Sequence, residues 1–258
     1  MYAMIFSKFF RIIMKPLLVA FDFDHTIVDG NTDVVVQKLI PNDKITDEVK
    51  KLYSSDGWTM FMQQIFELLH ADGVAPAQIR EAIIGIPATP GMDKLLRHLK
   101  QYDAEVIVVS DSNSVFIHDW LSSMKLEDTV TQVFTNPAKY DDTGFLRIQM
   151  YHVQDWCDLS SKNLCKGHIL SSYIAERQSQ GITFSQIAYV GDGKNDLCPS
   201  LRLTENDFIF AREGFMLVKR IREMQEGKDE RLKAKVHIWK SGDDIWNVLA
   251  NSLLEPHN

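Results

Sequence analysis

The stretch FDFDHTIVDGNTD, residues 21–33, follows an apolar run and places four aspartates within thirteen residues. Two of them, Asp22 and Asp24, flank a single phenylalanine where a segment rich in Leu and Val ends. Aspartate is a poor strand residue, and carboxylates this close repel one another unless a counter-charge lies nearby. The stretch therefore predicts a buried strand whose end carries a functional site.

Apolar runs of the same kind recur along the chain. Each gives way to polar residues, as expected of a strand buried in a parallel sheet. The clearest runs are 17–22, 105–111 and 186–193, and the shorter ones are 132–136, 207–211 and 235–239. Helical periodicity fills the intervals, beginning at Met92, Val115, Gly167 and Gly214. This alternation predicts an α/β fold with a Rossmann-like, mainly parallel sheet flanked by helices.

One segment interrupts the alternation between the first two strands. Residues 32–87 show helical patterns without a strand, and the segment leads into IPATPGM, whose prolines and glycine indicate a linker. We expect a small helical cap inserted after the first strand. The predicted organisation is an N-terminal extension at 1–15, a core domain at 16–31 and 88–258, and a cap at 32–87.

The composition is that of an ordinary soluble globular protein, with 45% hydrophobic and 24% charged residues among 258. The net charge of −7 and the pI near 5.6 argue against a nucleic acid partner. No run approaches the roughly 20 apolar residues of a membrane span. The low count of three cysteines favours a reducing compartment, so we expect a cytoplasmic protein.

The first fifteen residues, MYAMIFSKFFRIIMK, are apolar and basic and contain no acid. Two interpretations stay open for this segment. One is an extension outside the fold, which we favour, and the other is an organelle-targeting sequence.

Three predicted strands end in reactive polar residues. The carboxyl ends of parallel strands meet at one edge of a sheet, where ligands bind. The residues expected there are Asp22 and Asp24, Ser110 and Asp111, and Asp192 and Asp196. So many carboxylates need a counter-charge, and oxygen ligands of this kind suit Mg²⁺. In such a site Asp22 can attack phosphorus, and Asp24 can protonate the leaving oxygen and then activate water.

Four short motifs in order resemble those of the haloacid dehalogenase superfamily of phosphohydrolases. DFDHT at 22–26 resembles its first motif, and VVSDS at 108–112 resembles its second. The third is a lysine near a helix start, which NLCKGHIL at 163–170 supplies as Lys166, although Lys162 lies one helical turn away. GDGKND at 191–196 resembles the acidic fourth motif.

The resemblance implies a role for each of these residues. Asp22 is the implied nucleophile and Asp24 the general acid and base. Ser110 and Lys166 are implied to hold the phosphate, and Lys166 also to assist catalysis.

The resemblance also implies Mg²⁺ as cofactor. Its implied ligands are Asp22, the backbone carbonyl of Asp24, and Asp192. Asp196 is implied to belong to the metal site by orienting the metal's waters.

From about Leu17 to near the C-terminus, the chain more narrowly resembles the phosphoethanolamine/phosphocholine phosphatase family, which includes a pyridoxal phosphate phosphatase branch. FDFDHTIVDGNTD, SDSNSVFI, VFTNPA, KNLCK and YVGDGKNDLCP carry this likeness. It implies that Asp33 and Asp111 contact the substrate. Asp29 is an alternative candidate for the role of Asp33. A carboxylate beside a phosphate site repels substrate unless the substrate carries a positive charge, as ethanolamine does.

Several residues have a plainer interpretation. The aromatic residues of WTMFMQQIF, 58–66, are predicted to form the core of the cap rather than a choline cage, and Cys198 to pack as a small buried hydrophobe. Cys157 and Cys165 match two of three cysteines that precede the lysine in the family, but Ser160 replaces the middle one.

We therefore predict a Mg²⁺-dependent phosphomonoesterase that works through an aspartyl-phosphate on small amine-bearing esters such as phosphoethanolamine or phosphocholine. The alternative substrate is pyridoxal 5′-phosphate. More remote alternatives are a phosphotransferase on the same scaffold and a non-catalytic binding module. The sequence predicts no oligomeric state.

Overall fold

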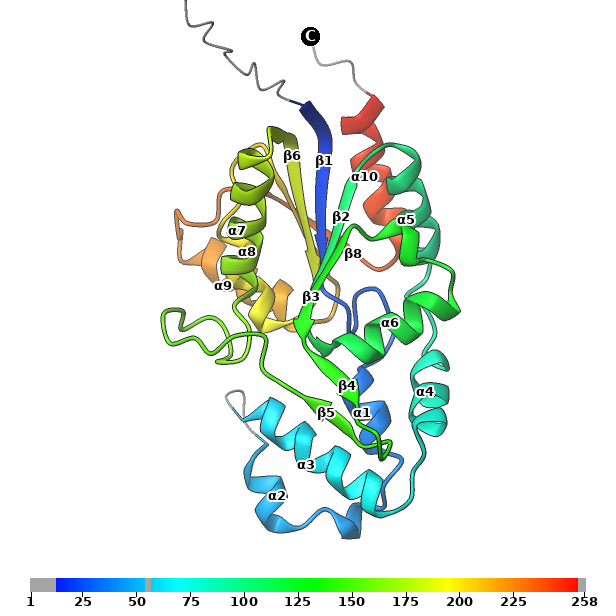
Figure 1. The fold of residues 1–258 in the computed structure, drawn as a ribbon. Helices are drawn as coiled ribbons and strands as arrows, with labels where there is room; N and C mark the ends of the chain where they lie inside the picture. The colour runs from blue at the N-terminus through cyan, green and yellow to red at the C-terminus, as the bar shows by residue number, and fades with distance from the viewer. Residues whose placement is uncertain (1–12, 54–56, 255–258) are drawn as a thin grey trace, which may run out of the picture.

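A six-stranded parallel sheet organises the computed structural model, which describes residues 13–53 and 57–254 (Figure 1). The strand order is β3-β2-β1-β6-β7-β8. Their bounds are β1 Ile13–Phe21, β2 Glu105–Asn113, β3 Gln132–Asn136, β6 Ile182–Gly191, β7 Phe208–Arg212 and β8 Lys235–Trp239. All six predicted strands are confirmed, and the α/β fold with them.

The first strand begins earlier than predicted. Ile13 pairs with Ile182 of β6, and its backbone N–H donates to the Gly181 carbonyl at 2.8 Å. Residues 13–15 therefore belong to the sheet and not to an extension. The rest of the predicted extension, 1–12, lies outside the described residues.

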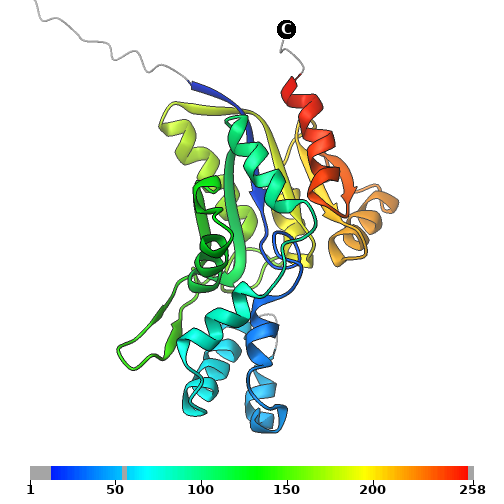
Figure 2. The ribbon, with the colours of Figure 1, turned by 90° about the vertical axis from the view of Figure 1, so that its right-hand side faces the viewer.

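Helices cover both faces of the sheet (Figure 2). One face carries α5 Met92–Gln101, α6 Ser114–Ser123 and α10 Gly242–Leu254, and the other carries α7 Lys166–Ser179, α8 Leu197–Ser200 and α9 Met216–Glu226. Successive residues of β1 point to opposite faces, because the side-chain period of a strand is two. Leu17 and Val19 accordingly belong to one hydrophobic core, while Leu18 and Ala20 belong to the other.

The segment between β1 and β2 is helical, as predicted. It contains α1 Thr32–Gln37, the 3₁₀ turn η1 Asn42–Lys44, α2 Asp47–Lys51, α3 Trp58–Ala71 and α4 Pro76–Ile84. Among its described residues it contributes no strand. Figure 1 shows these helices beyond the carboxyl ends of the sheet strands, so they stand over the predicted site. The domain boundaries stay predictions.

A hairpin after β3 was not predicted. Its strands, β4 Ala138–Tyr140 and β5 Leu146–Ile148, are antiparallel, and it reaches α3 of the cap, where the Ile148 N–H donates to Gln63 Oε1 at 3.0 Å. Strands of three residues are too short to show an alternating pattern in the sequence. The remaining short elements are the 3₁₀ turns η2 Glu127–Thr129 and η3 Lys194–Asp196.

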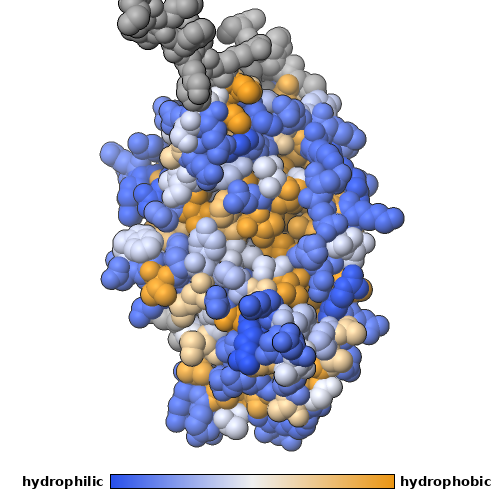
Figure 3. Space-filling view, viewed as in Figure 1, coloured by the Kyte–Doolittle hydropathy of each residue, from blue (hydrophilic) through white to orange (hydrophobic). Residues whose placement is uncertain are grey.

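Most of the surface seen in Figure 3 is hydrophilic, and hydrophobic residues gather along the middle of that face. Within 13–53 and 57–254, none of the helices combines the length and hydropathy that crossing a membrane requires.

Candidate active site

A cavity of about 370 Å³ opens at the carboxyl edge of the sheet. Six of the predicted site residues line it, and they come from the ends of three strands and from the start of the cap. These residues are Asp22, Asp24, Asp33, Ser110, Asp111 and Asp192. The other two, Lys166 and Asp196, lie buried behind them. The structure thus brings together all the residues that the motifs predict.

Lys166 forms a buried double ion pair at the start of α7. Its Nζ lies 2.8 Å from Asp22 Oδ2 and 2.8 Å from Asp196 Oδ1. Burial alone would lower the pKa of Lys166, but the carboxylates of Asp196 and Asp22 outweigh it and raise the pKa. Lys166 therefore stays charged beside Asp22. Lys162 is exposed, so it is not the lysine of this site.

Asp196 has all its acceptor positions filled. Its Oδ1 accepts from Lys166 and from the Tyr189 hydroxyl at 2.6 Å, and its Oδ2 accepts from the backbone N–H groups of Asp192 and Gly193 at 2.9 and 2.7 Å. A carboxylate offers about four lone-pair sites, so this side chain fixes the 191–193 loop and orients the lysine.

Of the three neighbouring carboxylates Asp22, Asp192 and Asp196, the first two keep free acceptor positions. Burial raises the pKa of Asp22 to about 7, although Lys166 lowers it, and burial raises the pKa of Asp192 to about 8. One oxygen of each lies within 4.8 Å of the other and of one from Asp196. Desolvated acids this close favour a bound cation, and an all-oxygen donor set fits Mg²⁺.

Asp24 is tied to the first helix of the cap. Its Oδ1 accepts from the Thr32 N–H at 2.9 Å and its Oδ2 from the Thr32 hydroxyl at 3.1 Å, at the start of α1. Burial raises the pKa of Asp24 well above its usual value. A carboxyl whose pKa is raised in this way is suited to general acid catalysis.

Asp33 lies beside two aromatic rings of the cap that line the cavity. Trp58 Nε1 donates to Asp33 Oδ2 at 2.6 Å, and the Trp58 and Tyr53 rings lie 5.2 Å apart edge to face. Both rings line the cavity. The prediction that the aromatic residues of 58–66 form the cap core holds for Phe61 and Phe66 but is incomplete for Trp58. Trp58 begins α3, where the helix reaches the cavity.

Asp111 is held by a residue that was not predicted from the sequence. Asn195, inside the GDGKND motif, donates to Asp111 Oδ2 at 2.6 Å and also lines the cavity. Burial raises the pKa of Asp111. Asn195 could have been found from its place between the two motif aspartates.

Asp29 has a structural partner. Its Oδ1 lies 2.6 Å from Arg212 Nη2, at the end of β7, and the same guanidinium donates to the His25 carbonyl at 2.5 Å. Asp29 does not line the cavity, whereas Asp33 does. Of the two competing acids, Asp33 is the one at the site.

A family described as Putative Phosphatase matches residues 17–253. The chain belongs to this phosphatase family. It is 38% identical to the Bos taurus pyridoxal phosphate phosphatase PHOSPHO2 over 239 residues, which cover 92% of this chain and 98% of the relative. It is 32% identical to the Homo sapiens phosphoethanolamine/phosphocholine phosphatase over 230 residues, 88% of this chain and 86% of that one. The predicted family and the phosphatase class are confirmed.

Solved structures support the fold. A phosphoserine phosphatase in apo form has a TM-score of 0.57 at 19% identity, covering 92% of this chain and 98% of its own. A structure titled as a phospho-aspartyl intermediate analogue of phosphoserine phosphatase has a TM-score of 0.53 at 21% identity, covering 83% and 99%. At these identities the likeness shows the haloacid dehalogenase-like fold.

Proposed function

We propose that this phosphatase hydrolyses small amine-bearing phosphomonoesters through an aspartyl-phosphate on Asp22, with Mg²⁺ as cofactor. One observation carries the proposal: a single cavity is lined by Asp22 and Asp24 and also by Asp33 and Trp58. The first pair suits a phosphoryl group, and the second suits a cation attached to it. The free cysteines support a cytoplasmic setting.

The residues divide the reaction into two steps. An oxygen of Asp22 attacks phosphorus while Asp24 donates its proton to the leaving oxygen, so the P–O ester bond breaks as an acyl phosphate forms. Asp24 then takes a proton from water, which attacks the same phosphorus, so the P–O bond to Asp22 breaks and inorganic phosphate leaves. Lys166 neutralises charge beside the nucleophile throughout, and Ser110 contacts the phosphoryl oxygens.

Mg²⁺ would be held by the carboxylates of Asp22 and Asp192 and by the backbone carbonyl of Asp24. When bound, it neutralises negative charge on the transferring phosphoryl group. Asp196 has no acceptor position left, so we place it as the residue that positions Lys166 and the 191–193 loop.

Asp33 supports an ammonium group as the second feature of the substrate. Its Oδ1 is buried and accepts no hydrogen bond from the residues that the structure describes, while Oδ2 accepts one from Trp58. An unmet acceptor on a desolvated carboxylate favours a ligand with N–H donors. Phosphoethanolamine has such donors, whereas the trimethylated nitrogen of phosphocholine has none. We therefore rank phosphoethanolamine first.

Pyridoxal 5′-phosphate is the second candidate. The relatives at 37–38% identity include several named pyridoxal phosphate phosphatase, whereas the phosphoethanolamine/phosphocholine phosphatases are at 32% and 29%. A protonated pyridine nitrogen also offers one N–H donor to a carboxylate.

The test compares kcat/KM for phosphoethanolamine, phosphocholine, pyridoxal 5′-phosphate and an uncharged sugar phosphate, with Mg²⁺. We expect kcat/KM to be highest for phosphoethanolamine. Asp22→Asn should abolish turnover of all four substrates, whereas Asp33→Asn should lower kcat/KM only for the cationic substrates. A highest value on the sugar phosphate would refute the amine proposal. A phosphorylated acceptor in place of free phosphate would indicate a phosphotransferase, and lack of turnover on every ester would indicate a binding module.

A further inference from the structure

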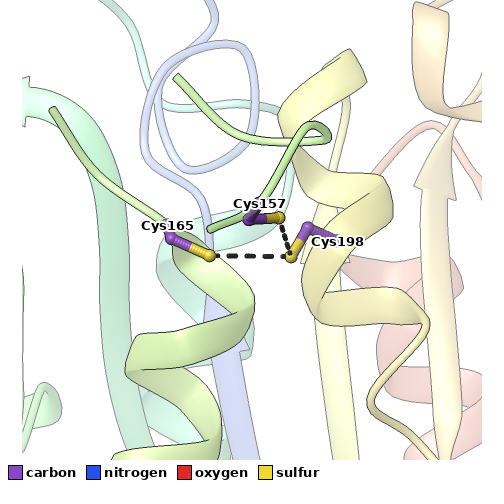
Figure 4. Close-up of side chains that lie close together, drawn as sticks. All are labelled: Cys157, Cys165 and Cys198. Atoms are coloured by element: carbon purple, nitrogen blue, oxygen red, sulfur yellow. Dashed lines mark hydrogen bonds between the residues drawn. The ribbon is translucent and has the colours of Figure 1, made fainter. Parts of the chain in front are cut away.

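Three thiols, one of them next to Lys166 in the sequence, lie together (Figure 4). The Sγ atoms of Cys157 and Cys198 are 3.4 Å apart, and those of Cys165 and Cys198 are 3.8 Å apart. All three sulfurs lie within 4.8 Å of one another. Cys198 is buried, as predicted, but it is not merely a small hydrophobe, because its sulfur sits between two others.

Ser160 lies beside the same cluster. Its Oγ lies 3.5 Å from Cys157 Sγ. One oxygen and three sulfurs are therefore gathered in one place. A tetrahedral zinc ion with Zn–S distances of about 2.3 Å requires sulfurs roughly 3.8 Å apart, which is close to the spacing found here.

The backbone around the cluster brings the three cysteines close together. The Ser160 N–H donates to the Cys157 carbonyl at 3.2 Å, so the two residues close a tight turn. Inside that turn the Gln154 amide donates to the Cys157 and Ser160 carbonyls and accepts from the Cys157 N–H. At the next segment, a Cβ on Gly167 would lie 2.5 Å from Cys198 Sγ, so only glycine allows α7 to pass this close.

The cluster joins three segments that the active site depends on. Cys157 belongs to 149–165, a long segment that contains no helix and only an isolated bridge. Cys165 immediately precedes Lys166, and Cys198 follows Asp196 by two residues. Long segments without regular structure are uncommon in a compact domain, and the contact between Cys157 and Cys198 joins this one to α8. A hollow of about 540 Å³ lined by Cys157 and Ser160 gives a route from solvent.

We propose that Cys157, Cys165 and Cys198 bind one Zn²⁺ as thiolates, with the Ser160 hydroxyl at the fourth position. Binding releases the three thiol protons and leaves no oxidation state changed. The site is separate from the oxygen-lined cavity, because thiolates select soft cations and carboxylates select Mg²⁺. It holds the segments that carry Lys166 and Asp196 in register, and its ligands do not touch the substrate cavity.

The test is a titration of the reduced, metal-free full chain with Co²⁺ as a spectroscopic probe. We expect thiolate-to-cobalt charge-transfer and tetrahedral ligand-field bands that saturate at one equivalent, disappear on addition of Zn²⁺ and persist in excess Mg²⁺. Because the readout is a spectrum and not turnover, its result is independent of whether the proposed phosphatase reaction is correct.

Variants make the assignment specific. Cys157→Ser removes one ligand and should weaken Zn²⁺ binding at least about 100-fold, since even outer-shell changes cost 10- to 100-fold. Ser160→Cys supplies a fourth thiolate, so it should tighten binding and intensify the charge-transfer band; Ser160→Ala is its matched control and should weaken binding. Ser160→Cys keeps all three native thiols, so it tests the site even if Cys157→Ser fails to fold.

Two results would overturn the proposal. One is a folded, reduced chain without cobalt bands whose three thiols react equally with a thiol reagent in the presence and absence of Zn²⁺. The other is an unchanged Zn²⁺ affinity in both Ser160→Cys and a folded Cys157→Ser.

Discussion

Asp33→Asn is expected to make the free protein more stable and the enzyme less effective on amine substrates. The Asp33 side chain is 3% exposed, and burial raises its pKa from the usual 3.8 to about 7. Asparagine has the same shape and keeps an oxygen that can accept from Trp58 Nε1, but it carries no charge. The substitution therefore removes the desolvation cost with little change in packing.

The size and sign of the effect follow from the two pKa values. The folded protein holds a proton on Asp33 between about pH 4 and pH 7, whereas the unfolded chain has released it. Stability is therefore lost as the pH rises through this window, and the loss is complete above pH 7. A gap of about three between the two pKa values corresponds to about 4 kcal/mol.

Urea-induced unfolding of wild type and Asp33→Asn, without metal or substrate, measures this effect. We expect the variant to exceed wild type by about 1.5 kcal/mol at pH 5 and by about 4 kcal/mol at pH 8. At pH 8 its kcat/KM on phosphoethanolamine should fall roughly 10- to 100-fold, since a hydrogen bond to a charged group contributes about 1.5–3 kcal/mol. A stability difference that does not grow with pH would show that Asp33 is not a desolvated carboxylate, and an unchanged kcat/KM would show that it does not contact the ammonium group.

Three further changes have distinct outcomes. Lys166→Met should lower the free energy of unfolding by about 3 kcal/mol and abolish turnover, because it leaves the buried Asp22 without its counter-charge. Thermal denaturation measures the first effect, and steady-state kinetics measure the second. Trp58→Phe removes a hydrogen bond that lowers the pKa of Asp33, so the acid limb of kcat/KM should move to higher pH for phosphoethanolamine but not for an uncharged sugar phosphate. Asp29→Asn should leave kcat/KM within about fivefold of wild type, because the Asp29 side chain is 44% exposed and an ion pair of this kind contributes at most about 1 kcal/mol.

Features with a local signature could be predicted from the sequence. The six strands of the sheet follow from apolar runs, and the site follows from the polar residues at their ends, because parallel strands meet at one edge. Helix starts predicted at Val115, Gly167 and Gly214 lie within two residues of the observed ones. The choice of Lys166 over Lys162 rested on the motif alone, and the ion pair with Asp22 now gives it a physical basis.

Features that depend on distant contacts could not be predicted. The partner of Asp29 lies 183 residues away, and the sequence holds no sign that Arg212 reaches it. The cavity position of Trp58 depends on how the cap is seated over the sheet. Cys198 is separated from Cys165 by α7 and β6, so only the folded chain shows that the three sulfurs meet.

We propose that the phosphoryl group is transferred to the Asp22 carboxylate, and trapping this acyl phosphate is the direct test. Asp24→Asn should be used with 4-nitrophenyl phosphate, whose leaving group needs no proton, so the intermediate forms but water is not activated. After a rapid quench, borohydride reduction converts an aspartyl-phosphate to homoserine, which peptide mass spectrometry locates. We expect homoserine at position 22, and none there when Asp22→Asn is added. Homoserine at another aspartate, or no homoserine while nitrophenol is released, would show that Asp22 is not the nucleophile.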